Sequence, residues 1–238
     1  MLKTLTNMTT KFKPILFSTP MVESLLAGIK SETRRTKGLE RVNLHPDEWV
    51  SATEGPWPAN EKSEFFTDFF NSAGSGEWQA CFSQYDIGDI LWVRETFFDA
   101  REFKKAPLFV DGPGFYYRAD GSSIGDHRWK PSIHMPKQAA RIFLKVTDII
   151  VERLQHISEY DAIAEGITPL AMSAMQLAER GQLYLDYCKP QELFMDGLSP
   201  VDSFKSLWCY INGEYHWVSN PWVWVYKFER VERPINFN

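Results

Sequence analysis

The order of the expected elements predicts an α+β fold, a small mixed β-barrel with peripheral helices and long insertions. That order runs strand, helix, insertion, several strands, helices and a final strand. Strands do not alternate regularly with helices, as a doubly wound parallel sheet would require. The 238 residues are 44 % hydrophobic and 15 % aromatic, with nine tryptophans, so the chain can bury a sizeable core.

The first expected elements are a strand over residues 13–17 and a helix over residues 19–28. The strand is the short apolar run KPILF. The helix begins at Thr19–Pro20, because threonine caps helix starts and proline suits the first helical position. Gly28 ends it in a left-handed cap. The chain therefore turns sharply at Gly28, and Lys30 emerges from that turn.

Residues 38–85 form an expected long insertion. They are rich in Gly, Pro, Ser and Asn, and these residues are mixed with aromatic ones. Sustained periodicity is lacking, so we expect a partly packed segment without regular elements.

The rest of the chain supplies four further expected strands and three helices. The strands cover residues 90–97, 115–118, 140–154 (one or two strands) and 220–231, and the helices cover residues 158–166, 169–187 and 199–212. The clearest helix is the last, because it begins at Ser-Pro, carries an apolar stripe and ends before a glycine. Gly181 is expected to break the helix over 169–187.

A basic turn is the first candidate site. The segment GIKSETRR brings Lys30, Thr33, Arg34 and Arg35 together directly after the first helix. Burial lowers the pKa of a lysine, so Lys30 can serve as a base or nucleophile. Arginine offers planar paired donors to a phosphate or a base edge. The alternative is a solvated basic loop.

Arg94 and Glu95 form a second candidate within the strand LWVRETF. Alternation along a strand puts their side chains on opposite faces. One of the two charges therefore points toward the interior or a pocket, where it needs a partner. The alternative is a structural ion pair.

The segment WKPSIHMPKQAAR, residues 129–141, is a third candidate, with two prolines that suggest a rigid extended loop. Trp129 or His134 can stack on a base. The ordinary pKa of histidine also suits His134 to proton transfer. The alternative is an ordinary loop histidine.

Glu165 is the fourth candidate, at the end of the helix SEYDAIAEG. A carboxylate at that position can face a lysine in a pocket. The alternative is a solvated helix residue.

Other signals exclude several classes of function. The chain lacks GxGxxG, P-loop, HExxH and GxSxG motifs, and its three cysteines are scattered, so we expect neither a metal nor another cofactor. The net charge of −5 argues against a protein that coats nucleic acid through bulk positive charge. No stretch approaches the ~18 apolar residues of a membrane span. Free thiols fit a reducing cytoplasm, where we expect the protein.

Four segments together resemble the ASCH (activating signal cointegrator homology) domain. They are GIKSETRR after a helix, DIGDILWVRETF, the EGI that follows the next short helix, and the closing strand NPWVWVYKFERV. The likeness covers residues 14–37, 86–97, 115–167 and 199–232, and it is nearest to the longer versions found in bacteriophages and prophages. It implies a single domain over residues 13–232, with insertions at about 38–85 and 168–198. The implied fold is a β-barrel similar to the PUA domain, an RNA-binding fold, with a cleft beside the first helix.

The resemblance also implies an activity. Some small family members are similar to amidohydrolases that act on acetylated cytidine through a lysine, a threonine three residues later and a distant glutamate. Lys30 and Thr33 match the first two by motif, and Glu165 matches the glutamate by position, with Glu95 as its rival. Other members bind or cut RNA.

Three functions follow as hypotheses, all with a nucleoside, nucleotide or RNA as partner and none at a membrane. The first is an amidohydrolase acting on N4-acetylcytidine or a similar nucleoside in a bacterial or phage-infected cell, with Lys30, Thr33 and Glu165 as catalytic residues. The expected ligand-binding residues are Arg34, Arg35, Arg94, Glu95, Trp129 and His134. The second is a non-catalytic RNA-binding phage accessory protein. The third is a metal-independent ribonuclease with His134 or Lys30 as base.

Overall fold

The fold is a mixed α+β arrangement, as the sequence predicts. The computed structural model describes residues 11–52, 65–102, 114–189 and 197–237. These residues contain ten strands and five α-helices, and the sheets dominate. A closed barrel and a single domain stay predictions.

The chain divides into two compact units. Unit 1 comprises Met1–Gly28, Gly88–Val146 and Phe228–Asn238. Unit 2 comprises Ile29–Ile87 and Thr147–Lys227. Each unit is therefore built from segments that are far apart in the sequence.

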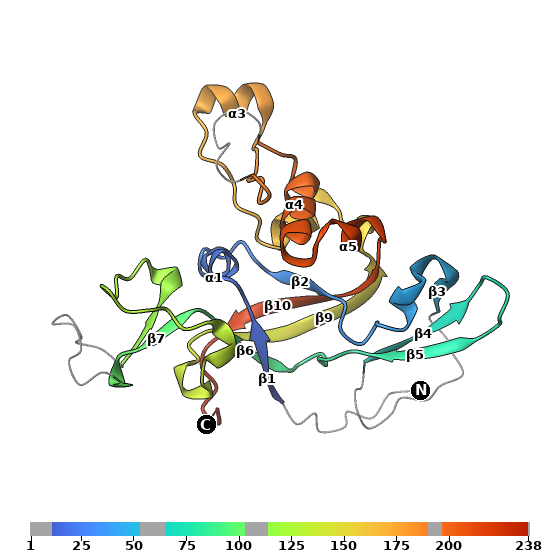
Figure 1. Cartoon of the computed structure of the whole chain (residues 1–238), viewed down its shortest axis with the longest axis horizontal. Helices are drawn as coiled ribbons and strands as arrows, with labels where there is room; N and C mark the ends of the chain where they lie inside the picture. Colours follow the sequence, from blue (N-terminus) through green and yellow to red (C-terminus); the bar gives the residue numbers. More distant parts are fainter. Residues whose placement is uncertain (1–10, 53–64, 103–113, 190–196, 238) are drawn as a thin grey trace. The chain divides into compact units, whose positions relative to one another are not determined.

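The largest sheet has five strands (Figure 1). In spatial order they are β1 (Phe12–Leu16), β6 (Ile90–Arg94), β9 (Phe143–Arg153), β10 (Trp222–Val231) and β2 (Glu32–Arg35). β1 runs parallel to β6, whereas β6 is antiparallel to β9 and β10 is antiparallel to β2. Four of these five strands were expected from the sequence. The exception is β2, whose four residues belong to the basic turn.

Unit 1 contains the first helix, α1 (Thr19–Leu26). The N-cap position is occupied by Ser18, not by Thr19, so the expected threonine cap is wrong. The Ser18 side chain makes no capping hydrogen bond. Thr19 instead begins the helix with Pro20, whose fixed φ suits the first turn. Gly28 follows with φ of +74°, which confirms the left-handed turn after the helix.

The strand expected over residues 90–97 is split in unit 1. β6 ends at Arg94, and the chain resumes as β7 (Phe97–Asp99), which pairs with β8 (Phe115–Tyr117) in a two-stranded sheet. Backbone hydrogen bonds between Phe97 and Lys130 add to the pairing of β7 with β8. Residues 90–99 therefore contribute strands to two different sheets.

Unit 2 contains a second sheet where the long insertion was expected to lack regular elements. Its strands are β3 (Trp49–Ala52), β4 (Phe66–Asn71) and β5 (Trp78–Phe82), all antiparallel. Aromatic rings pack across β4 and β5, with ring centroids 5.8 Å apart for Phe66 and Phe82 and 5.2 Å apart for Phe70 and Trp78. Phe69 is buried on the opposite face of β4. Aromatic residues on both faces hide the two-residue alternation. Residues 53–64 of the expected insertion lie outside the described residues.

Four helices belong to unit 2. They are α2 (Glu159–Ala164), α3 (Ala174–Arg180), α4 (Pro200–Asn212) and α5 (Glu214–Val218). The Ser158 side chain caps the start of α2 by accepting a hydrogen bond from the Asp161 amide. α3 is shorter than the predicted helix over 169–187, because a capping box starts it at Ser173 and Gly181 ends it. None of the described helices combines the length and apolar character that crossing a membrane requires.

Candidate functional site

Lys30 is completely buried in unit 2. The amide of Ser31 donates to the carbonyl of Ala164 over 2.8 Å, which fixes this segment against the end of α2. The Lys30 ammonium donates to the carbonyl oxygens of Glu32 (2.9 Å) and Glu165 (2.6 Å) and to Glu165 Oε2 (3.0 Å). These acceptors match the three donors of a charged lysine. Lys30 therefore does not form the solvated basic loop that was the alternative to a site.

Arg34 shares a carboxylate with Lys30. Its Nη1 donates to Glu32 Oε1 over 2.6 Å and to Glu165 Oε1 over 3.2 Å. Its Nε and Nη2 donate to Glu152 Oε1, at the end of β9, over 3.2 and 2.8 Å. The guanidinium also lies 5.8 Å from the ring centroid of Phe204 on α4. Glu165 thus bridges Lys30 and Arg34, one oxygen to each.

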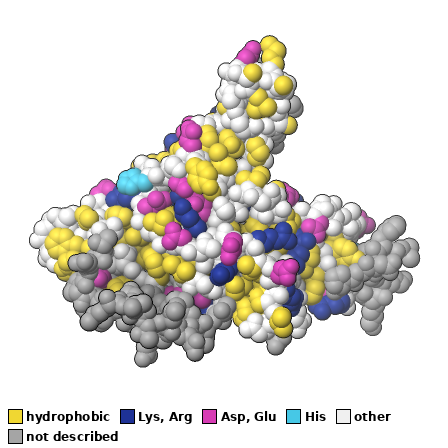
Figure 2. Space-filling model, turned by 180° about the vertical axis from the view of Figure 1, so that it is seen from behind, with side chains coloured by type: hydrophobic (Ala, Val, Ile, Leu, Met, Phe, Trp, Pro, Cys, Tyr) yellow, Lys and Arg dark blue, Asp and Glu magenta, His cyan; other side chains and the backbone are white. Residues whose placement is uncertain are grey.

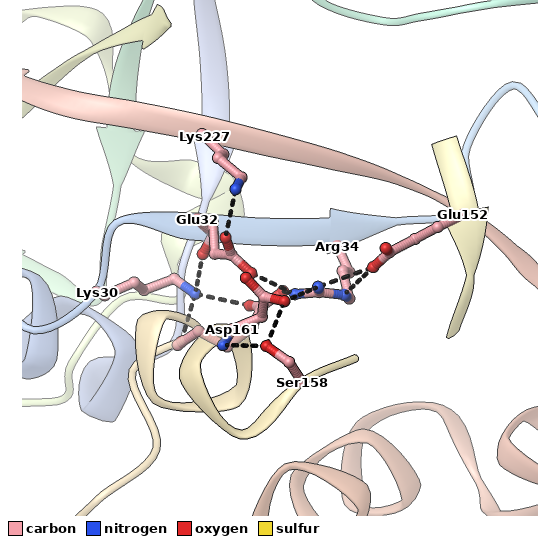
Figure 3. Close-up of polar contacts among 8 residues, drawn as sticks. Lys30, Glu32, Arg34, Glu152, Ser158, Asp161 and Lys227 are labelled. Carbon is pink, nitrogen blue, oxygen red and sulfur yellow. Dashed lines mark hydrogen bonds and ion pairs between the residues drawn. The ribbon is translucent and has the colours of Figure 1, made fainter. Parts of the chain in front are cut away.

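Two outer residues complete this cluster, which we call the Lys30 network. Asp161 Oδ2 lies 4.0 Å from Arg34 Nη2, and Lys227 Nζ lies 3.9 Å from Glu32 Oε2. The network consists of Lys30, Glu32, Arg34, Glu152, Asp161, Glu165 and Lys227. Figure 3 shows its labelled side chains converging from β2 and the turn before it, and from β9, α2 and β10. With every group ionised, four carboxylates face three cations, so the network carries one net negative charge.

Three outer members of the Lys30 network are partly exposed to solvent. The Lys30 side chain is 0 % exposed, whereas the side chains of Glu152, Asp161 and Lys227 are 25 %, 24 % and 40 % exposed. The Lys30–Glu165 pair is therefore the most deeply buried part of the network, and these three side chains are its most exposed members.

Burial shifts the pKa values of two groups in the network in opposite directions. It lowers the pKa of Lys30, although the neighbouring carboxylate of Glu165 works against this. It raises the pKa of Glu32, although Arg34 works against that. Desolvation disfavours the charged form of each group, which brings the proton affinities of an amine and a carboxylate closer together. Such shifts are typical of sites that transfer protons.

Thr33 and Arg35 lie on the other face of β2. Successive side chains alternate along a strand, and Glu32 and Arg34 point into the network. Thr33 is buried, and it is opposite Tyr226 in the register of β2 with β10. The structure thus brings together Lys30 and Glu165 but turns Thr33 away from them, and the expected catalytic role of Thr33 stays a prediction.

Glu95 is bound by an arginine in unit 1. Glu95 directly follows β6 and continues the buried alternation of Leu91 and Val93, so Glu95 is the charge that points inward. Arg141 donates to both carboxylate oxygens of Glu95 over 2.9 Å. It also donates to both oxygens of Asp120 (2.8 and 2.7 Å). Glu165 is therefore the carboxylate beside Lys30, while its rival Glu95 pairs with Arg141.

The remaining expected ligand-binding residues lie in unit 1. The Arg94 guanidinium donates to the Ile133 carbonyl and lies 5.6 Å from the ring centroid of Trp92. His134 is exposed at the end of a short 3-10 helix, Ser132–His134. Trp129 is half-buried against a cluster of apolar side chains around Phe98, so its ring contributes to packing. These residues and the Lys30 network belong to different units.

Sequence reasoning missed four members of the Lys30 network: Glu32, Glu152, Asp161 and Lys227. For Glu32 the signal was present, because Lys30, Glu32 and Arg34 recur every second residue, which is the spacing of one strand face. The contact between Arg34 and Glu152 spans 118 positions, and no local pattern reports it. Within the described ranges, no group of three or more His, Cys, Asp and Glu side chains is arranged to hold a metal ion.

The comparisons with known proteins add no further information about the site. Searches against protein-family models, curated proteins and solved structures found no match to the chain.

Proposed function

We propose that this protein is an ASCH-like amidohydrolase that removes the acyl group from an N-acylated nucleoside of the N4-acetylcytidine type. The observation that carries the proposal is the buried contact between Lys30 Nζ and Glu165 Oε2, at 3.0 Å. A charged hydrogen-bond donor and a proton acceptor side by side are two groups that an enzyme can use to hydrolyse an amide. The sequence likeness supports the same pair.

The proposed reaction is the addition of water to the acyl carbon. The Glu165 carboxylate takes a proton from the water as the new C–O bond forms. The Lys30 ammonium exchanges one of its three protein acceptors for the oxyanion that develops on the acyl oxygen, and donates a hydrogen bond to it. The proton then passes from Glu165 to the leaving nitrogen as the C–N bond breaks, which yields cytidine and acetic acid from N4-acetylcytidine; the acid releases its proton to solvent as acetate.

The charges of the Lys30 network support a neutral substrate. Its carboxylates outnumber its cations, and Arg34 is already paired with Glu32, Glu152 and Glu165. A phosphate group would have to displace these carboxylates, whereas a nucleoside base would not. On the face drawn in Figure 2, acidic and basic side chains of the described residues are interspersed rather than separated. This pattern favours a small neutral ligand over a long polyanion at this face.

The test is incubation of the full chain with N4-acetylcytidine, followed by chromatographic measurement of cytidine. We expect release from the wild type and from Lys37→Ala, a matched control at an exposed lysine of the same segment. Lys30→Ala and Glu165→Gln are expected to lose release by at least about 100-fold, the usual size of an acid–base contribution. No release from the wild type, or unchanged release from Lys30→Ala, would overturn the proposal.

Three further variants sharpen this test. Lys30→Arg keeps the positive charge, so a loss of activity in a variant with a wild-type circular dichroism spectrum reports chemistry rather than unfolding. Thr33→Ser and Thr33→Val test the hydroxyl of Thr33. If Thr33→Val is as active as Thr33→Ser, the hydroxyl has no part in the reaction.

RNA binding is the second candidate function, and one observation in unit 1 favours it. Residues 127–141 include Arg128, Lys130, Lys137 and Arg141 but no aspartate or glutamate, although the chain as a whole is acidic. Arg128 and Lys137 are exposed. A binding assay with single-stranded RNA at two salt concentrations tests this function, because phosphate contacts weaken as salt rises. Absent or salt-independent binding, or full binding by Arg128→Ala/Lys137→Ala, would argue against it.

A further inference from the structure

Two of the three cysteines lie at α4 in unit 2, one on the helix and one in the segment that contacts it. Cys188 is exposed, and its thiol donates to the carbonyl of Ser206 on α4 over 3.5 Å. Cys209 is partly buried and lies three residues after Ser206 on the same helix. Cysteine thiols that share a location can react with each other, so the placement of these two side chains is of chemical interest.

The segment before Cys188 is aligned with α4 residue by residue. The Ser203 hydroxyl donates to the carbonyl of Leu185 over 2.7 Å. One turn later, the Ser206 hydroxyl accepts from the amide of Tyr187 over 3.0 Å. Positions 203, 206 and 209 are spaced by three, so they are neighbours on one face of the helix. The chain that ends at Cys188 therefore runs along the face that carries Cys209.

The direction of side chains on a helix brings the two thiols closer still. Side chains lean toward the helix N-terminus, over the preceding turn. The Cys209 thiol thus leans toward the carbonyl of Ser206, which is the acceptor of the Cys188 thiol. The two thiols also interact electrostatically: burial raises the pKa of Cys209, and the neighbouring Cys188 raises it further.

Cys81 provides an internal contrast. It lies in β5, is 3 % exposed, and burial raises the pKa of its thiol to about 12. A buried thiol with so high a pKa is inert toward oxidants, because the thiolate is the reactive form. Reactivity is therefore expected at Cys188 first.

We propose that Cys188 and Cys209 are a modification site, at which a peroxide converts the two thiols into a reversible disulfide. The Cys188 thiolate attacks one oxygen of hydrogen peroxide, the O–O bond breaks, and a sulfenic acid and water result once a proton is taken up. The Cys209 sulfur then attacks the sulfenic sulfur, the S–O bond breaks, and a second water leaves. Two thiols and one peroxide thus give one disulfide and two waters.

The disulfide closes a loop of about twenty residues, between the turn at Cys188 and the last turns of α4. Cross-linking restricts the unfolded chain, so the oxidised protein is expected to melt several degrees higher than the reduced protein. A thiol reductant reverses both changes.

The test treats the full chain with hydrogen peroxide and counts free thiols after denaturation. In the wild type the count should fall from three to one, with the loss of two hydrogen atoms in the intact mass and a cross-linked peptide that contains Cys188 and Cys209. Cys81→Ser should fall from two thiols to none. Cys188→Ser and Cys209→Ser should form no intramolecular disulfide, and dithiothreitol should restore every thiol.

Three results would overturn the proposal. They are a count that stays at three, oxygen added to Cys188 without a cross-link, and disulfide-linked dimers in place of the intramolecular bond. A circular dichroism spectrum equal to that of the wild type shows that each serine variant is folded, so a missing cross-link reports the missing thiol.

Discussion

In unit 1 a single arginine, Arg141, lies between two carboxylates, whereas in unit 2 a lysine and an arginine share one. Arg141 binds Glu95 and Asp120 with all of its nitrogens and lies 3.8 Å from the ring centroid of Tyr117. Glu165 instead divides its oxygens between Lys30 and Arg34. In unit 1 two carboxylates bind one cation, whereas in unit 2 two buried cations bind one carboxylate.

This difference separates a structural ion cluster from a candidate site. Arg141 cannot lose its proton in a protein, and its contacts form a closed set. Lys30 can titrate, and its partner Glu165 has a second cation beside it. Proton transfer uses buried titratable pairs of this kind, in which one carboxylate contacts two cations. Packing alone does not require such a pair. Four predictions test the comparison, from the largest expected effect to the smallest.

Glu165→Ala is expected to be the most damaging substitution. It leaves the ammonium of Lys30 and the guanidinium of Arg34 without their common buried partner, so the free energy of unfolding should fall by about 3–5 kcal/mol. Urea unfolding followed by circular dichroism measures this change. Glu179→Ala, at an exposed glutamate of α3, is the control and should cost less than about 0.5 kcal/mol. A loss of less than about 1 kcal/mol in Glu165→Ala would mean that the two cations do not depend on Glu165.

Arg141→Met should destabilise unit 1 less, by about 1–3 kcal/mol. The variant leaves Glu95 buried without its arginine, but burial already raises the pKa of Glu95, so this carboxylate can take up a proton and become neutral. Methionine also keeps most of the packing on Tyr117. The same urea titration applies. If Arg141→Met proves more damaging than Glu165→Ala, the ranking of the two clusters is reversed.

Glu95→Gln tests the sign of the pKa shift at Glu95. Because burial raises the pKa of Glu95 in the folded state above its usual 4.5, the folded protein binds this proton more tightly than the unfolded chain. The free energy of unfolding of the wild type should therefore fall, relative to that of Glu95→Gln, as the pH rises from about 4.5 through the raised pKa. Paired unfolding curves between pH 4 and 7 (a range of about three units around the usual carboxylate pKa) measure the difference. A relative gain by the wild type over that range would show that Arg141 outweighs burial.

Glu152→Gln should have the smallest effect on stability, about 0–1 kcal/mol. Its carboxylate contacts Arg34 from the solvent edge of the Lys30 network, where water screens the ion pair. Thermal unfolding at low and high salt measures this contribution, which should shrink as salt is added. A loss near that of Glu165→Ala would instead place Glu152 among the buried members of the network.

The sequence predicts elements that have a clear period and sharp ends. α4 and β10 follow from an apolar stripe and from a run of strand-forming residues, and Gly28 and Gly181 mark helix ends through their left-handed backbones. β4 was missed because its aromatic residues lie on both faces, which removes the alternation that reports a half-buried strand. Such a strand is defined by its neighbours, and these are set by the tertiary fold.

The candidate site was predictable only in part, for a related reason. Lys30 is visible in the sequence because a basic residue follows a helix-ending glycine. Glu165 was a candidate through its place at a helix end, but it was matched with Lys30 only through the family resemblance, since 135 positions separate the two residues. Glu32 carries a local signal, but Glu152 and Asp161 are acidic residues in segments that give no sign of what they face. Long-range pairing of charges is a property of the fold, and a single sequence does not encode it in any local pattern.

The end of α2 has a consequence for the order in which this chain acquires structure. A helix of six residues is marginal by itself. The carbonyls at the end of α2, those of Ala164 and Glu165, accept hydrogen bonds from the amide of Ser31 and the ammonium of Lys30. During synthesis the N-terminal side of the chain leaves the ribosome first. The segment that completes α2 is therefore already available when α2 emerges. A fragment that begins after residue 31 would lack these donors, and its α2 would fray from the end that carries Glu165.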